Sequence, residues 1–188
     1  MLEAKEVSRR DEAAPALDEV TIRLLPRSAR FSLRLRPAEA KRLGRVADFA
    51  LDQDINRLVA TGERRSLRLG PDDWLLLAPE AGSEAIAEEI GSGLAGVFHA
   101  LVDIGHREIA FEIAGQAGAR VINSGCPLDL ADAAFPAGSA TRTLLAKAEI
   151  VLARPGEAPL WRVECGRSFA AYVEGWLTEA AAAVNGRR

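Results

Sequence analysis

Few residues in this sequence belong to the types that carry out acid–base or metal chemistry. Its 188 residues include two histidines, His99 and His106, and neither has a partner carboxylate at the spacing of a metal site. Asp103 and Glu108 lie close to His106, but neighbouring residues of a strand point to opposite faces of a sheet. We therefore interpret both histidines as isolated surface residues. A Ser–His–Asp set needs no fixed order along a chain, and no feature here points to one.

The two cysteines are interpreted as structural thiols. Cys126 and Cys165 are far apart and lack the C-x-x-C spacing of zinc and redox sites. Cys165 ends an alternating run with Trp161 and Val163, which predicts a small buried side chain. Cys126 follows a predicted helix end, and no adjacent histidine or basic run would favour a thiolate. We prefer a structural role for Cys126 over a nucleophilic one.

Two glycine-containing stretches come nearest to a phosphate-binding loop. Residues 91–93 (Gly-Ser-Gly) end a predicted helix rather than opening one, and residues 115–118 (Gly-Gln-Ala-Gly) lack the full G-x-G-x-x-G pattern. The sequence contains no P-loop. We interpret both stretches as caps or turns, so no cofactor-binding residue is assigned.

Four polar residues have both a functional and a structural interpretation. Arg142, within Thr-Arg-Thr, could pair with an acidic group of a partner or with a folate glutamate. Alternatively, it could face solvent or pair with a carboxylate of its own chain, and we slightly prefer this structural interpretation. Arg167 and Ser168 carry the same ambiguity. Asp129 could cap a short helical turn that begins at Leu130.

Residues 23–45 are strongly basic. They contain eight Lys and Arg against one acid, a balance of +7 in a chain whose net charge is −3. This segment could form a basic face for an acidic partner or a polyanion, or simply the solvated faces of a strand and a helix. Because no aromatic stacking platform accompanies it, we do not expect a nucleic-acid site.

The composition is that of a soluble globular protein. Hydrophobic residues make up 48% and charged residues 27% of the chain, whereas aromatics make up only 5%. No apolar run approaches the ~20 residues that cross a bilayer, and the N-terminus lacks the apolar region of a secretory signal. We expect a cytoplasmic protein with no membrane partner.

The first half predicts an alternation of strands and helices that would position these groups. Residues 1–18, which are polar and contain alanine and proline, are interpreted as a flexible arm. Phe31, Leu33 and Leu35 alternate with polar residues and predict a strand with one buried face. The other predictions are a helix at 38–50, a helix end or loop at 51–62, strands at 65–69 and 74–77, and a helix at 84–94 capped by Ser83.

The second half centres on residues 101–152. Apolar residues alternate on both sides of residues 105–106 and predict a hairpin with one buried face: Val102, Ile104, Ile109, Phe111 and Ile113. A helix at 117–123, a loop to Gly138, a long strand at 141–152 and a return strand at 160–165 follow. A final amphipathic helix begins after Ser168.

This order of elements predicts an α+β fold. It has two small subdomains, at 19–96 and 97–188, with mainly antiparallel sheets covered by helices.

Five short stretches of the second half carry a resemblance to a known family. They are residues 103–107 (DIGHR), 114–120 (AGQAGAR), 125–130 (GCPLDL), 135–138 (FPAG) and 141–146 (TRTLLA). Flanking stretches extend it: residues 69–77 (LGPDDWLLL), 167–170 (RSFA) and 176–177 (WL). Together these stretches, spread over roughly residues 67–180, resemble the gamma subunit of heterotetrameric bacterial sarcosine oxidases.

The resemblance implies a fold similar to the folate-binding aminomethyltransferases and a non-catalytic role. In that family, the complex oxidatively demethylates sarcosine to glycine and yields hydrogen peroxide and 5,10-methylenetetrahydrofolate. The implied partners are the alpha, beta and delta subunits, which would hold FAD, FMN, NAD, tetrahydrofolate and zinc. The gamma chain would have no catalytic, cofactor-binding or metal-binding residue, and alone it would be inactive.

Two alternatives stay open. The chain could be a stand-alone folate-binding protein of the aminomethyltransferase type, although it is short and poor in aromatics for lining a folate pocket. It could also be the equivalent subunit of a sister complex that acts on another N-methyl amine, such as dimethylglycine or methylglutamate.

Overall fold

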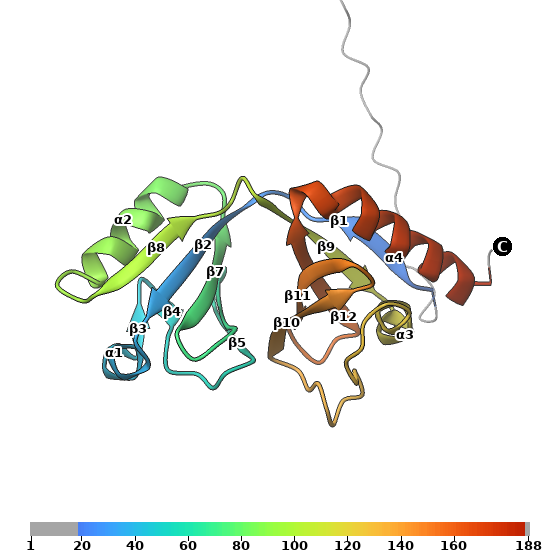
Figure 1. The fold of residues 1–188 in the computed structure, drawn as a ribbon, viewed down its shortest axis with the longest axis horizontal. Helices are drawn as coiled ribbons and strands as arrows, with labels where there is room; N and C mark the ends of the chain where they lie inside the picture. Colours follow the sequence, from blue (N-terminus) through green and yellow to red (C-terminus); the bar gives the residue numbers. More distant parts are fainter. Residues whose placement is uncertain (1–18, 187–188) are drawn as a thin grey trace, which may run out of the picture.

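A computed structural model describes residues 19–186 of the chain, so the arm predicted for residues 1–18 lies outside the described residues. The molecule has two halves that lie side by side (Figure 1). The first contains β2 (Ser28–Leu35), α1 (Pro37–Leu43), β3 (Arg45–Val46), β4 (Phe49–Ala50), β5 (Arg57–Thr61), β6 (Arg64–Arg68), β7 (Asp73–Pro79), α2 (Ser83–Gly93) and β8 (His99–Asp103). The second contains β1 (Thr21–Leu24), β9 (Glu108–Ala114), α3 (Gly118–Asn123), β10 (Ser139–Leu145), β11 (Ala148–Arg154), β12 (Leu160–Gly166), the 3-10 turn η1 (Arg167–Phe169) and α4 (Ala170–Val184).

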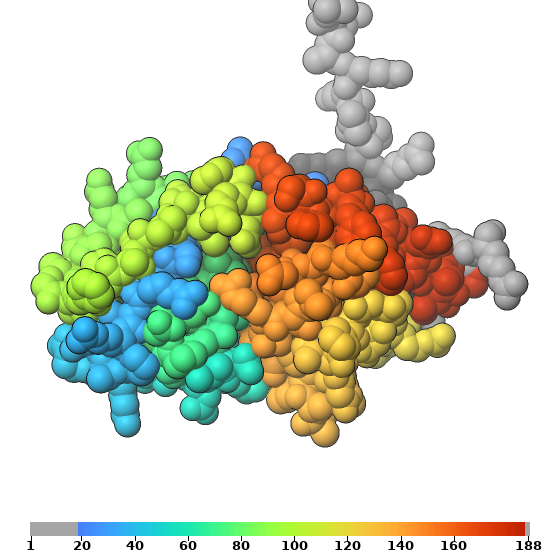
Figure 2. All heavy atoms as spheres, in the orientation of Figure 1, coloured from blue at the N-terminus to red at the C-terminus, as the bar shows by residue number. Residues whose placement is uncertain are grey.

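In residues 19–186, ten strands form one continuous antiparallel sheet that belongs to both halves, and β3 and β4 form a separate two-stranded sheet. The order of the large sheet is β1-β9-β12-β11-β10-β5-β6-β7-β2-β8. The two halves join between β10 and β5, where a single pairing, Ser139 with Arg57, links them. In the space-filling view, the blue-to-green atoms of the first half meet the orange-to-red atoms of the second (Figure 2).

The two halves share the same strand order. Read from the junction outward, the first half runs β5-β6-β7-β2-β8 and the second β10-β11-β12-β9-β1. The edge strands differ in origin, because β8 follows α2 in the sequence whereas β1 precedes β2. The chain therefore crosses between the halves twice, at residues 25–27 and 104–107 (Figure 1).

The start of β1 lies against the end of α4. The Val20 amide donates to Asn185 Oδ1 at 2.9 Å, and Asn185 Nδ2 donates to the Val20 carbonyl at 3.0 Å. These bonds hold the first and last described elements of the second half together.

Each half has its own apolar core beneath its helices. As predicted, Phe31, Leu33 and Leu35 of β2 are buried, and they pack in one cluster with residues of α2. In the second half, alternate residues of β9 and β12 pack in another cluster with residues of α3 and α4. A third, smaller cluster joins β6 and β7 of the first half to β10 and β11 of the second.

The hairpin predicted around residues 105–106 is wrong. Strands β8 and β9 exist, but β8 pairs with β2 and β9 pairs with β1 and β12. Ile104, between them, packs in the third cluster. Because β8 belongs to the first sheet half and β1 to the second, the strand pairing does not follow the division predicted at residue 96.

Two predicted elements are shorter than expected. The helix predicted at 38–50 ends at Leu43, because Gly44 takes a φ of 65° and its amide donates to the Ala40 carbonyl. The long strand predicted at 141–152 is the pair β10 and β11, which turn at Ala146 with a φ of 50°. The segment expected as a helix end or loop at 51–62 contains the strand β5.

Neither predicted serine cap is an N-cap. Ser83 is the first residue of α2 and follows the N-cap Gly82, whereas Ser168 lies in the 3-10 turn before α4.

Candidate functional site

The inner faces of the two halves carry most of the buried charge. Arg30 and Arg34 of β2 point away from the apolar core of the first half, because they alternate with its buried residues. Glu108 and Glu112 of β9 alternate in the same way with the core residues of the second half. Glu164 of β12 lies on this same inner face.

A buried ion pair connects the two inner faces. Arg30 Nε lies 2.8 Å from Glu164 Oε2, and each side chain is 1% exposed. Glu164 Oε1 also accepts from Arg162 Nε at 2.6 Å, and Arg30 Nη1 donates to the Ser28 carbonyl at 3.1 Å. Both oxygens of Glu164 are therefore bound to arginines, which is the arrangement a buried carboxylate needs.

A second, more exposed ion pair joins the halves nearer the surface. Asp73 Oδ2 of β7 lies 3.0 Å from Arg142 Nη2 of β10 and 3.4 Å from Arg34 Nη2. The Asp73 side chain is 7% exposed, whereas those of Arg142 and Arg34 are more than half exposed. Arg142 thus pairs within its own chain, which is the interpretation preferred from the sequence.

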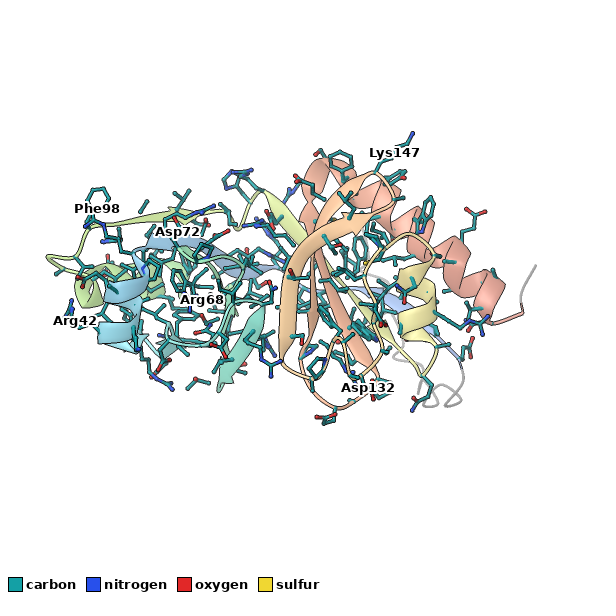
Figure 3. All side chains as sticks on the ribbon, turned by 60° about the horizontal axis from the view of Figure 1, so that its bottom comes forward. Arg42, Arg68, Asp72, Phe98, Asp132 and Lys147 are labelled. Carbon is teal, nitrogen blue, oxygen red and sulfur yellow. The ribbon has the colours of Figure 1, made fainter. Side chains whose placement is uncertain are left out.

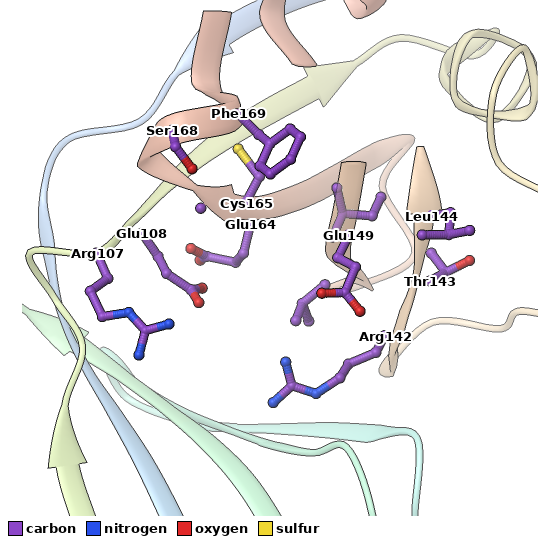
Figure 4. A pocket seen from close by; sticks show the side chains of 13 residues that line it. Arg107, Glu108, Arg142, Thr143, Leu144, Glu149, Glu164, Cys165, Ser168 and Phe169 are labelled. Carbon is purple, nitrogen blue, oxygen red and sulfur yellow. The ribbon is translucent and has the colours of Figure 1, made fainter. Parts of the chain in front are cut away.

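A cavity of about 640 Å³ lies on the inner face of the second half. It is lined by residues from the ends of β9, β10, β11, β12 and from η1: Arg107, Glu108, Arg142, Thr143, Leu144, Glu149, Ile150, Val151, Glu164, Cys165, Gly166, Ser168 and Phe169. Figure 4 shows the carboxylates of Glu108 and Glu164 turned toward the same space. This cavity is the candidate functional site, since it gathers Arg142, Cys165 and Ser168 from the sequence-based candidates.

Glu108 is a cavity carboxylate whose pKa is raised by its surroundings. Burial raises the pKa of Glu108, and the neighbouring Glu164 carboxylate raises it further, against the lowering effect of Arg142, Arg30 and Arg107. Within residues 19–186 its side chain forms no ion pair. A cation placed in the cavity would therefore stabilise the ionised form of Glu108.

Cys165 is unsuited to nucleophilic chemistry. The residue is 2% exposed, and burial raises the pKa of its thiol to about 11, with the Glu164 and Glu108 carboxylates adding to the effect. A thiol with so high a pKa is not a thiolate at neutral pH. The geometry agrees with the structural role predicted for it.

The remaining sequence-based candidates do not line the cavity. His106 is exposed, and His99 Nδ1 lies 2.8 Å from the Val97 carbonyl. Cys126 is buried in the core of the second half, with its Sγ 3.8 Å from Thr143 Oγ1. Asp129 Oδ1 accepts from the Ala131 amide, as a turn cap does.

In each of the two glycine-containing stretches, close packing against a neighbouring segment requires a glycine. A Cβ on Gly93 would overlap Val46, and a Cβ on Gly115, whose φ is +126°, would overlap the Glu19 backbone.

In residues 19–186, no group of three His, Cys, Asp or Glu side chains is placed to hold a metal ion. No helix of the same residues is long and apolar enough to cross a membrane.

The basic segment at residues 23–45 is largely neutralised within the chain. Arg23 pairs with Glu112, Arg27 with Glu80, and Arg30 with Glu164. Arg34 and Arg42 also have carboxylate partners. Most of this charge therefore serves internal ion pairs rather than a free basic face.

Sequence reasoning missed the central pair Arg30 and Glu164 and the cavity carboxylate Glu108. The available signal was the alternation of charged with buried residues along β2 and β9, basic on one strand and acidic on the other. Because strand pairing was assigned incorrectly around residue 105, the two charged faces were not brought together.

Comparison with known proteins gives consistent matches. A model of the family described as "Sarcosine oxidase, gamma subunit family" matches residues 37–183. The heterotetrameric sarcosine oxidase from Corynebacterium sp. U-96, in complex with pyrrole 2-carboxylate, contains a similar chain. That chain is 25% identical with a TM-score of 0.76, over 88% of this chain and 85% of the other. A search of curated proteins gave no match.

A second solved structure is similar in fold alone. It is the glycine cleavage system aminomethyltransferase T from Bartonella henselae, with a TM-score of 0.66 and 11% identity, over 85% of this chain and 45% of that one. The α+β fold with antiparallel sheets, predicted from the sequence, is thereby confirmed.

Proposed function

Because the chain belongs to the sarcosine oxidase gamma subunit family, we propose that it is the non-catalytic gamma subunit of a heterotetrameric sarcosine oxidase. The observation that carries the proposal is the family match over residues 37–183. The likeness to a chain of a heterotetrameric sarcosine oxidase, which extends over most of both chains, supports it.

In this proposal the complex oxidatively demethylates sarcosine to glycine and produces hydrogen peroxide and 5,10-methylenetetrahydrofolate. The alpha, beta and delta subunits hold FAD, FMN, NAD, tetrahydrofolate and zinc, and this chain contributes packing surface. The complex is cytoplasmic.

The chemistry of the cavity supports a non-catalytic role. Its thiol has a raised pKa, and Glu164 is bound to two arginines. Neither histidine of the chain lines it. These side chains do not form the nucleophile–base pair that covalent catalysis requires.

The second candidate is a stand-alone folate-binding protein, favoured by the fold likeness to aminomethyltransferase T. This chain spans 45% of that protein, and Phe169 is the one aromatic residue that lines the cavity described here. We therefore rank this candidate below the subunit.

The test is purification of the tagged chain from its native host. We expect a yellow complex with larger chains, which oxidises sarcosine and releases hydrogen peroxide, whereas the chain purified alone is colourless and inactive. Comparison of sarcosine with dimethylglycine and methylglutamate would identify the substrate. A colourless eluate of this chain alone, or turnover by the isolated chain, would refute the proposal, and folate titration would then test the second candidate.

A further inference from the structure

An aromatic strip lies exposed along the start of α4. Its exposed rings are Phe169 and Tyr172, and the half-buried Trp176, which also packs against the core of the second half, follows at helical spacing. Phe169 is 45% and Tyr172 39% exposed, and the rings of Tyr172 and Trp176 lie 6.2 Å apart. Aromatics are scarce in this chain, at 5%, and aromatic residues are enriched at the cores of protein interfaces. The strip is therefore a candidate contact surface.

The strip continues into the cavity on the inner face of the second half. Phe169 lines that cavity together with Leu144 of β10, which is 45% exposed. The turn after β10 lies against the same region, because the Ala146 amide donates to the Gly125 carbonyl and Gly125 lies beneath the Trp176 indole. Apolar side chains thus border one side of a polar cavity.

The charged residues of the cavity are unevenly compensated. Glu164 and Arg142 are ion-paired with residues on β2, β12 and β7. Glu108 and Glu149 have no ion-pair partner within residues 19–186. Among the charged lining residues, Arg107, which lies at the exposed rim, also has none in these residues. The cavity therefore has more uncompensated negative than positive charge, which is complementary to a cationic side chain.

We propose that the aromatic strip and the cavity form the docking surface for a segment of a larger partner subunit. That segment places a lysine or arginine side chain against Glu108 and Glu149 and lays apolar side chains on Phe169 and Tyr172. The inference rests on the proposed function, since it names the surface through which the gamma subunit joins its complex. A small cation could pair with the carboxylates but would leave most of the cavity and the strip uncovered, so a protein segment fits both features.

The first test compares two double variants of the tagged chain in the native complex. Phe169→Ala with Tyr172→Ala removes the two exposed rings of the strip. Phe98→Ala with Val102→Ala, at residues 82% and 52% exposed on the first half, is the matched control. Figure 3 shows Phe98 on the opposite half from Lys147, which lies in the turn between β10 and β11. We expect the strip variant to recover at least tenfold less of the larger subunits than wild type, and the control to recover as much.

The second test reverses charge at the cavity. Glu149→Lys should weaken recovery of the larger subunits about tenfold, because it opposes the partner's cation. Glu157→Lys, at an exposed residue in the turn between β11 and β12, should leave recovery unchanged. Both are surface changes, so this pair decides the question if the strip variant does not fold.

The outcomes separate the inference from the proposed function. A wild-type chain that recovers no larger subunit refutes both. Undiminished recovery with Phe169→Ala/Tyr172→Ala and with Glu149→Lys, or loss with the Phe98 control instead, refutes the docking surface alone. A strip variant that converts a dimer of this chain into a monomer, seen by sedimentation, also refutes it, because the occupant is then a second copy.

Discussion

The two halves of the molecule have the same strand order, but their equivalent strands β2 and β9 carry opposite charges on the faces that the halves turn toward each other. On the outer faces, both follow one pattern, with alternate apolar residues packed beneath two helices. On the inner faces, β2 carries Arg30 and Arg34, whereas its counterpart β9 carries Glu108 and Glu112. The apolar residues on the outer faces form the core of each half, whereas the charged residues on the inner faces favour one relative placement of the two halves.

The comparison also shows that only part of this charge is deeply buried. The pair of Arg30 and Glu164 is enclosed, whereas the pairs of Asp73 and of Glu112 include arginines that are more than half exposed. Exposed ion pairs contribute little to stability, and breaking a buried pair costs much more. The cost of removing one partner of an ion pair should therefore increase with the burial of that pair, and this gradient orders the expected effects.

The largest effect is expected from Glu164→Gln. The substitution leaves Arg30 buried without its carboxylate, which should lower the free energy of unfolding by about 3–5 kcal/mol. Urea denaturation followed by tryptophan fluorescence measures it. The double variant Arg30→Met/Glu164→Leu removes both fully buried charges and should regain part of the loss, because Arg162 still lacks its carboxylate partner. A loss below about 1 kcal/mol for Glu164→Gln would show that the central pair does not hold the halves together.

An intermediate effect is expected from Asp73→Asn. Arg142 and Arg34 lose an ionised acceptor but can be hydrated, since both are more than half exposed. We expect a decrease of about 1–2 kcal/mol in the free energy of unfolding. Asp72→Asn is the matched control, because Asp72 pairs with Arg34 at the surface and should change stability by less than about 0.5 kcal/mol. Equal losses for the two variants would contradict the gradient.

The smallest effect is expected from Glu108→Gln, which should raise the stability of the folded protein, whereas the two substitutions above lower it. Burial raises the pKa of Glu108 above its ordinary value of 4.5, so the folded protein favours the protonated form. Wild type should lose stability as pH rises from about 4.5 through the raised pKa, whereas the variant does not lose this contribution. Glu108→Gln should therefore melt slightly higher than wild type at pH 8 and equally at pH 4. Glu157→Gln controls for the loss of one negative charge, and a variant that melts lower at pH 8 would contradict the prediction.

The local elements were largely predictable from the sequence because each depends on nearby residues. The alternation of Phe31, Leu33 and Leu35 and the spacing along α2 and α4 identify buried faces directly. The end of α1 was less accessible, because the amphipathic pattern continues through Val46 and Phe49, which are buried from the hairpin β3–β4 instead. The turn between β10 and β11 was also not predictable, because Ala146 takes a positive φ there and alanine is not a typical turn residue.

The strand partners and the site were not predictable in the same way. The alternation in β8 and β9 fixes which face is buried, but any strand edge offers the same backbone hydrogen bonds. Arg142 and Ser168 were singled out and do line the cavity, whereas Glu108 and Glu164 belong to it because β9 and β12 pair. Such a site depends on topology, which residue spacing does not encode.

The contact between Val20 and Asn185 has a consequence for how the chain is organised. If residue 186 were joined to residue 19 and the chain opened between Gly105 and His106, each half would become continuous. The order would read β9-α3-β10-β11-β12-α4-β1, followed by β2-α1-β5-β6-β7-α2-β8, with β3 and β4 after α1. Each half would then show the same uninterrupted order of one strand, one helix, three strands, one helix and one edge strand, with the short hairpin β3–β4 added in the first half.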